Sequence, residues 1–264
     1  MQPRRPQLFM SKLPAQYRFI DLSDYGRPGG RWIARMLQDT RFTPIHVTVL
    51  FIISGLFAIG CILHGDYVLA ALFLILKSVI DAADGELARL KKTPSYVGRY
   101  FDSIADLILN LLFLLAFMQI TGSTIIWTLV AFIGLQLQGT LYHYYYVILR
   151  NNVNGDITSR ISEEVQPIAL PGEKQSMVNL CHSIYNVLYG PFDQFIHWLD
   201  PEAVHTKSFP KWFMTSLSIY GLGFQLLLMA LLLVTGWQQA IIPGILGMTL
   251  FIFVFIAIRR LFIK

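Results

Sequence analysis

Four aspartates stand in a regular pattern between residues 81 and 106, where two strongly apolar segments of the chain meet. Small residues and one arginine lie between them, in the order Asp81-x2-Asp84-Gly85-x2-Ala88-Arg89-x8-Gly98-x3-Asp102-x3-Asp106. Ionised side chains at the end of a membrane segment are costly, so a cluster of them there indicates a functional site. At 3.6 residues per turn, each half of the pattern falls on one face of its own helix.

The chemistry that suits this pattern is the binding of hard divalent cations. Two carboxylate faces that meet across a helical hairpin would form an oxygen-rich pocket for one or two Mg²⁺ or Mn²⁺ ions. Residues 85, 88 and 98 are small and leave room for a substrate, and the Arg89 guanidinium could bind a phosphate. Together these features favour a nucleoside diphosphate held on metal ions. The ion pathway of a transporter would also use carboxylates, but it gives no role to Arg89 or to the small residues.

This pattern resembles the signature of the CDP-alcohol phosphotransferase family, because all eight signature residues and all the spacings are present. The resemblance implies an all-α integral membrane protein, a homodimer of protomers with six transmembrane helices. It also implies a divalent-metal-dependent transferase of phospholipid biosynthesis, which moves a substituted phosphate group from a CDP-linked donor to an acceptor hydroxyl and releases CMP. The competing hypotheses are a divalent-cation transporter, which would move metal without nucleotide, and a non-catalytic membrane scaffold, against which the intact signature argues.

The resemblance assigns roles to individual residues. It places the metal site at Asp81, Asp84, Asp102 and Asp106, and it makes Asp106 the general base that takes the acceptor proton. Binding of the donor nucleotide would involve Asp81, Gly85, Ala88, Arg89, Gly98 and Thr48. Near Thr48 the chain departs from the family pattern Thr-Pro-Asn-x-x-Thr, because Ile45 replaces the Asn and His46 follows it. His46 could take over the lost contact, or it could simply cap the helix.

The sequence defines the substrates less well than the reaction. A glutamate directly after Gly85, here Glu86, is a feature that resembles family members acting on inositol-type substrates. The arm at Ile20–Ser23 instead resembles the arm of the choline and ethanolamine branch. We favour CDP-diacylglycerol as the donor, because that branch is the larger one among small six-helix members. The alternative is a CDP-headgroup donor of choline, ethanolamine or inositol type, with a lipid as the acceptor.

Other polar residues are candidates for contacts with the acceptor or with a phosphate. Lys77 lies four residues before Asp81 on the same helical face, so we expect it to pair with Asp81 or to contact a substrate phosphate. A later apolar segment carries one polar stripe, formed by Gln136, Thr140, His143 and Arg150. Such a stripe usually faces a cavity, which makes His143 and Arg150 candidates for substrate contacts. For Gln136, Thr140 and His143, hydrogen bonds between helices are the alternative.

The composition independently indicates a membrane protein. Hydrophobic residues make up 55% of the 264 positions, and apolar runs long enough to span hydrocarbon recur along the chain. Six spans are predicted, at residues 45–64, 67–90, 100–121, 124–149, 209–236 and 239–262.

The distribution of basic residues predicts the orientation in the membrane. The net charge is +5, but the predicted outer turns near residues 64–66, 121–124 and 236–239 contain no Lys or Arg. This asymmetry places both termini and the aspartate motif at the cytoplasmic face. The basic surplus would then meet anionic lipid headgroups and anionic substrate, which removes the need to invoke nucleic acid as a partner.

The chain is expected to contain one membrane domain with a short cytoplasmic segment before it. Residues 1–42 should form a cytoplasmic arm, poorly ordered or lying on the surface over its first 27 residues, and an amphipathic helix at Arg31–Leu37 on the inner leaflet. Residues 43–264 should form the catalytic domain. Cys61 and Cys181 are far apart in sequence and are expected to be free thiols.

A cytoplasmic insert is predicted at residues 151–208 of this domain. Within it, apolar residues at helical spacing predict a second surface helix at 174–198, broken at Gly190-Pro191. The insert could cover the site or select the acceptor, or it could simply connect two spans.

Overall fold

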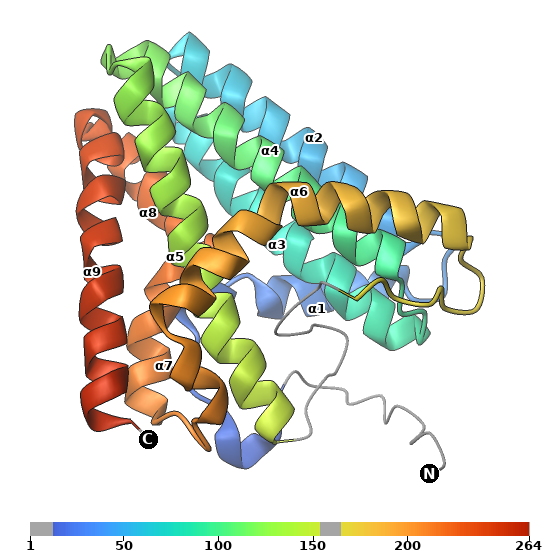
Figure 1. Cartoon of the computed structure of the whole chain (residues 1–264). Helices are drawn as coiled ribbons and strands as arrows, with labels where there is room; N and C mark the ends of the chain where they lie inside the picture. The colour runs from blue at the N-terminus through green and yellow to red at the C-terminus, as the bar shows by residue number, and fades with distance from the viewer. Residues whose placement is uncertain (1–12, 154–164, 264) are drawn as a thin grey trace.

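The computed structural model describes residues 13–153 and 165–263, and all regular elements within these ranges are helices (Figure 1). The α-helices are α1 Arg27–Leu37, α2 Pro44–His64, α3 Tyr67–Lys91, α4 Tyr96–Thr121, α5 Ile125–Asn152, α6 Gln175–Leu199, α7 Lys211–Leu217, α8 Leu222–Val234 and α9 Ile241–Phe262. The described ranges also hold short 3₁₀ helices: η1 Ala15–Tyr17, η2 Leu22–Asp24, η3 Pro201–His205, η4 Ser218–Tyr220 and η5 Gln238–Ala240.

Local capping sequences fix the helices that carry the motif. The Thr43 N–H donates a hydrogen bond to His46 Nδ1 (3.0 Å), which completes a capping box at the start of α2. His46 therefore caps the helix, one of its two predicted roles. Ser95 caps α4 by accepting a hydrogen bond from the Gly98 N–H (2.8 Å). The α3–α4 hairpin thus turns sharply between the two halves of the aspartate pattern.

Within residues 13–153 and 165–263, four helical segments are long and apolar enough to cross a membrane: α2, α4, α5 and Gln238–Phe262, which ends with α9. The bent pair formed by α7–η4 and α8 would make a fifth span. Helix α3 has 25 residues, but six of its side chains are charged, and such a composition does not identify a span by itself. The membrane-protein class is therefore confirmed, whereas a sixth span through α3 stays a prediction.

The predicted span 209–236 is not one straight helix. The chain breaks at Gly221, whose backbone is extended (φ −68°, ψ 144°), and the two parts meet at an angle of 56°. At this break Ser218 Oγ accepts a hydrogen bond from the Leu22 N–H (2.9 Å). The predicted span therefore consists of two helical parts that meet at a bend, which apolar composition alone does not reveal.

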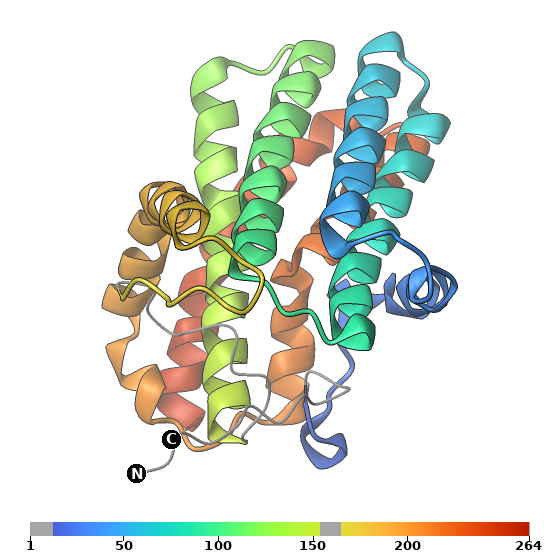
Figure 2. The same cartoon turned by 90° about the vertical axis from the view of Figure 1, so that its right-hand side faces the viewer.

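Helix α6 lies across the outside of α4 and α5 (Figures 1 and 2). The predicted break at Gly190-Pro191 is wrong, since the helix continues from Gln175 to Leu199 with Pro191 inside it. It bends in its middle part (Figure 1), as a helix with an internal proline commonly does. Val178, His182 and Ile196 are buried against the bundle, whereas Val187 and Trp198 are exposed.

The N-terminal segment is packed more closely than the sequence predicted. In α1, a Cβ atom added at Gly30 would lie 2.9 Å from the backbone of Ala82 and Ala83, so this helix approaches α3 beside the motif. Trp32 and Met36 point away from that contact and are exposed. The surface position of α1 on a membrane stays a prediction. The segment Asp21–Asp24, predicted to be poorly ordered or surface-lying, packs against α5 and α8; residues 1–12 lie outside the described residues.

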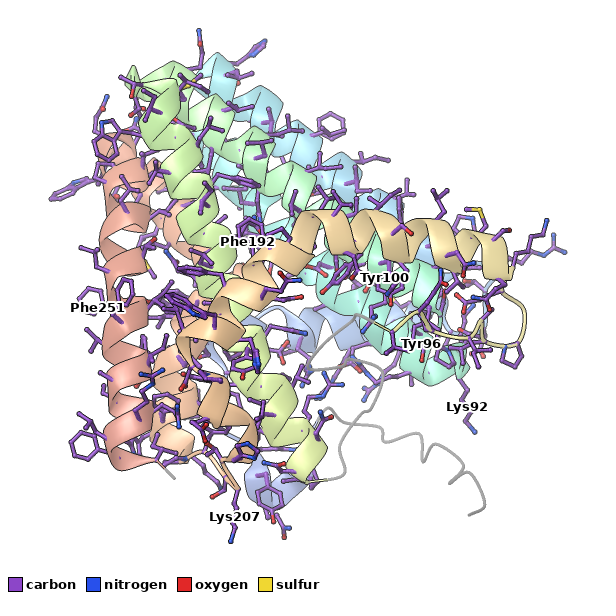
Figure 3. The ribbon with its side chains drawn as sticks, in the orientation of Figure 1. Lys92, Tyr96, Tyr100, Phe192, Lys207 and Phe251 are labelled. Atoms are coloured by element: carbon purple, nitrogen blue, oxygen red, sulfur yellow. The ribbon has the colours of Figure 1, made fainter. Side chains whose placement is uncertain are left out.

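The three predicted outer turns lie together at one end of the bundle, and α9 ends at the opposite end (Figures 1 and 2). The apolar side chains on the outer surface suit a lipid environment. Phe251, for example, lies on the outer face of α9 with 56% of its surface exposed (Figure 3). Inside, Phe51, Leu74 and Phe113 belong to a buried core that holds α2, α3 and α4 together.

Candidate active site

The α3–α4 hairpin brings the two halves of the aspartate motif together. One carboxylate oxygen each from Asp81, Asp102 and Asp106 lies within 4.8 Å of the other two. Asp81 comes from α3 and the other two come from successive turns of α4, as the 3.6-residue period requires. We call these three residues the acid cluster.

Lys77 is the cation of this site. Its Nζ forms ion pairs with Asp81 (3.1 Å) and with Asp106, and it lies 4.6 Å from the centre of the Phe51 ring. The side chain is only 1% exposed. A buried lysine needs charged partners, so the ion pair predicted with Asp81 is present, and a second pair with Asp106 is added. The lysine thereby joins α3 to α4.

Asp84 lies beside the acid cluster rather than in it. Its Oδ2 accepts a hydrogen bond from the Thr48 hydroxyl (2.9 Å). Thr48 thus contacts the predicted metal ligand Asp84, and this contact ties α2 to the motif.

The acid cluster has the donor set of a divalent metal site. Oδ1 of Asp102 is buried without a hydrogen-bond partner among the described residues, although buried carboxylate oxygens are nearly always satisfied. Carboxylate oxygens from two helices are the ligands that Mg²⁺ and Mn²⁺ prefer. The residues present therefore fit the predicted metal, with Asp81, Asp102 and Asp106 as its ligands and Asp84 next to them.

The predicted nucleotide-binding residues lie at the end of α3. Arg89 pairs with Glu86 (3.1 Å), and Glu86 also pairs with Arg27 (3.2 Å) and Arg31 (3.6 Å) of α1. A Cβ atom added at Gly85 would lie 3.5 Å from the Arg89 guanidinium. This is an ordinary van der Waals distance, so the guanidinium lies against the Gly85 face of α3. Ala88 is half-buried on the same helix, and Gly98 lies under the Ser95 cap of α4.

A cavity of about 410 Å³ opens next to the acid cluster. Asp81 and Asp106 belong to its lining, together with residues of α4, α5, α6, α8 and the N-terminal arm. Most of the lining residues carry hydrogen-bonding side chains; the exceptions are Ala82, Leu135, Leu222, Gly139, Gly221 and Gly223. The cavity therefore offers many hydrogen-bonding groups to a ligand, although apolar atoms contribute more of its surface than polar atoms do.

All members of the polar stripe predicted on α5 line this cavity, namely Gln136, Thr140, His143 and Arg150. Arg150 is buried, and its guanidinium lies 5.7 Å from the centre of the Tyr146 ring. Hydrogen bonds between helices were the alternative role for this stripe. On α5 such bonds are made by Gln138, which donates to the Ile245 carbonyl (3.0 Å) and to Thr249 (2.9 Å) of α9.

Several cavity residues were not predicted from the sequence. They are Asp21, Ser23 and Asp24 of the arm, Asn110 of α4, Tyr142 and Tyr146 of α5, and Tyr185, Tyr189 and Asp193 of α6. The Tyr189 hydroxyl donates to the Ser103 carbonyl (2.7 Å), which docks α6 against α4 between two members of the acid cluster. Helical spacing could have indicated Asn110, one turn after Asp106 on α4, and Tyr142 and Tyr146 on α5. It carries no signal for the residues of the arm and of α6, because they come from distant segments.

A bundle whose described elements are all helices, with apolar outer faces and an acid cluster beside a cavity, is typical of an integral membrane protein with a candidate metal site. Residues 41–199 match the CDP-alcohol phosphatidyltransferase family, and they include the whole aspartate motif. Since the match covers more than half of the 264 residues, the chain belongs to this family of transferases of phospholipid synthesis. No curated protein sequence matches the chain.

Proposed function

We propose that this chain transfers a substituted phosphate group from CDP-diacylglycerol to a hydroxyl of a polar alcohol and releases CMP. The observation that carries this proposal is the cavity, which shares Asp81 and Asp106 with the acid cluster. A small alcohol fits a cavity of about 410 Å³ in which most lining residues carry hydrogen-bonding side chains, since such groups orient a polar ligand. This choice favours a lipid-linked donor over a CDP-headgroup donor.

The residues of the site have distinct tasks in this reaction. Asp81, Asp84, Asp102 and Asp106 would hold one or two Mg²⁺ or Mn²⁺ ions, which offset the charge that develops on the leaving CMP. Arg89, together with Asp81, Gly85, Ala88, Gly98 and Thr48, would bind the cytidine diphosphate part of the donor. Asp106, which lies in both the acid cluster and the cavity, takes the proton from the acceptor hydroxyl as its oxygen bonds to phosphorus. The bond from that phosphorus to CMP breaks at the same time.

Lys77 would hold Asp106 in place through their ion pair. His143 and Arg150 would contact the acceptor or its anionic group from α5. The orientation with the site and both termini at the cytoplasmic face, where cytidine nucleotides are found, and the homodimer belong to the same proposal.

Binding of cytidine nucleotides tests this function. The purified protein should gain thermal stability from CDP or CMP only when Mg²⁺ or Mn²⁺ is present, because ligand binding to the native state stabilises it. It should also release CMP from CDP-diacylglycerol when a polar alcohol is added. A divalent-cation transporter would be stabilised by the metal alone and would move metal across vesicles without nucleotide, so that result would replace the transferase.

A further inference from the structure

The N-terminal arm forms a wall of the cavity on the side of α5 and α8. Asp21, Ser23 and Asp24 all contribute to the lining, although the arm precedes the aspartate motif by about two helices. The family match begins at residue 41, so this wall comes from outside the matched region.

Close backbone packing holds the arm in this position. A Cβ atom added at Gly223 would lie 1.9 Å from the Ser23 carbonyl oxygen, and one added at Gly221 would lie 2.3 Å from the Ser23 side chain. No side chain fits at such distances, so the start of α8 accepts the arm only because both residues are glycines. The hydrogen bond from the Leu22 N–H to Ser218 Oγ (2.9 Å) fixes the same segment.

Asp21 presents a carboxylate to the cavity from this wall. It accepts hydrogen bonds from the Tyr142 hydroxyl (2.5 Å), the Ser23 N–H (3.0 Å) and the Ser23 hydroxyl (2.6 Å). All three donors are neutral groups. A carboxylate has about four acceptor positions, so Asp21 retains capacity for one more donor and carries a charge that these groups do not neutralise.

We propose that Asp21 is a specificity-determining residue that binds a hydrogen-bond donor of the acceptor alcohol, either a further hydroxyl or an ammonium group. This inference rests on the proposed function. The reacting hydroxyl would lie at Asp106 and the second polar group at Asp21, so the cavity selects alcohols with two polar ends. Tyr142 positions the Asp21 carboxylate through its short hydrogen bond.

Steady-state kinetics of Asp21→Asn test this assignment. CMP release from CDP-diacylglycerol is first measured for the wild type with Mg²⁺ and with glycerol, inositol, serine or ethanolamine as the acceptor, which also separates hydroxyl from ammonium recognition. For the best acceptor, the variant should raise KM about tenfold or more, the scale of losing one hydrogen bond to a charged group, with kcat and the KM of the donor little changed. Asp66→Asn, at the exposed α2–α3 turn, serves as the matched control.

A second variant displaces the arm without changing a polar group. Gly223→Ala should raise the acceptor KM in the same way, and its combination with Asp21→Asn should add little, because the two changes remove the same contact. Gly247→Ala is its control, since a Cβ atom there meets nothing within 4 Å.

The outcomes separate this inference from the proposed function. An unchanged acceptor KM in Asp21→Asn, or an equal rise in the KM of the donor, overturns the role of Asp21 while leaving the transferase intact. Preferred transfer from a CDP-headgroup to diacylglycerol also overturns it, because the acceptor would then lack the second polar group. A wild type that releases no CMP from any CDP donor contradicts the function itself.

Discussion

At the scale of single residues, the site combines the buried Lys77 with the carboxylates of Asp81 and Asp106. We propose that the same carboxylates also bind the metal. Lys77 neutralises part of the charge of the acid cluster through its ion pairs with Asp81 and Asp106. A bound metal would neutralise the charge of the same carboxylates. The two cations therefore compete for the same negative charge. Substitution of Lys77 should therefore change mainly the stability of the metal-free protein, whereas substitution of Asp106 should change mainly kcat.

Replacing Lys77 by methionine should destabilise the metal-free protein more than the metal-bound protein. Removal of one partner from a buried ion pair costs about 3–5 kcal/mol, because the remaining charges stay buried and unpaired. Added Mg²⁺ would restore a positive charge beside Asp81 and Asp106, so thermal unfolding should show a larger Mg²⁺-induced rise in Tm than in the wild type. Lys92→Met, at the exposed α3–α4 turn, is the control; an equal rise in both variants would contradict the competition.

Replacing Asp106 by asparagine should separate proton transfer from donor binding. Asparagine keeps the shape but cannot accept a proton at neutral pH, so kcat should fall by about 10²-fold or more. Nucleotide binding in Mg²⁺, measured by the thermal shift with CDP, should weaken less than in Asp102→Asn, because Lys77 already neutralises part of the Asp106 charge. Asp102→Asn should lose this binding, because it removes one ligand of a hard-cation site. If the Asp106 variant loses nucleotide binding as completely, its main task is metal binding and the base must be sought elsewhere.

At the scale of elements, the segment before α6 caps the N-terminus of α4. Glu173 Oε1 accepts hydrogen bonds from the Ser95 hydroxyl (2.7 Å) and the Val97 N–H (2.8 Å). A carboxylate at a helix N-terminus is favourable because it meets unpaired N–H groups and the positive end of the helix dipole. The insert is thus part of the structure that positions Gly98 and Asp102, beyond its role as a connector between α5 and α7.

This contact predicts a pH dependence for the start of α4. Burial raises the pKa of the Glu173 carboxyl, but hydrogen bonds from Val97 and Ser95 outweigh this and hold the pKa below its ordinary value. The contact therefore stabilises the folded protein fully above the ordinary glutamate pKa of about 4.3 and loses this contribution as the pH falls through the lower folded value. Hydrogen exchange at residues 95–98 should accelerate over that range beyond the intrinsic pH effect.

The matched variant for this measurement is Glu173→Gln. Glutamine has no charge to lose, so exchange at the start of α4 should be faster than in the wild type at neutral pH and should show no additional step at low pH. An unchanged profile in the variant would show that the cap of α4 does not depend on Glu173.

At the scale of the whole molecule, the three turns at one end of the bundle contain no Lys or Arg, and the acid cluster lies toward the other end. This arrangement predicts which parts of the surface are accessible from each side of the membrane. Lys92 points away from the molecule at the α3–α4 turn (Figure 3), and Gly122 lies at the exposed α4–α5 turn. The two positions should lie on opposite sides.

Cysteine labelling in intact cells tests this orientation. In a background with Cys61 and Cys181 replaced by alanine, Gly122→Cys should react with a membrane-impermeant thiol reagent and Lys92→Cys should react only after permeabilisation. The reverse pattern would place the site outside the cytoplasm and contradict the proposed access to cytidine nucleotides.

The sequence by itself determined the features that depend on neighbours along one helix or one hairpin. The helical periodicity predicted that Asp81 lies on one face of its helix and that Asp102 and Asp106 share a face of the next helix. It also predicted that the polar stripe ending at Arg150 lies on one face of a third helix. These relations follow from 3.6 residues per turn, and the family followed from the same pattern. The helical membrane-protein class followed from the apolar runs.

Only the tertiary structure decided how distant segments complete the site. Asp21 meets Tyr142 across 121 positions of sequence, Glu173 caps α4 from beyond α5, and the chain breaks at Gly221 where the arm packs. Lys77 pairs with Asp106 as well as with its neighbour Asp81. Such contacts arise from the shape and charge of surfaces that meet only after the helices have packed. No local periodicity records them, so Asp21, which we propose as the residue that selects the acceptor, became visible only in the folded molecule.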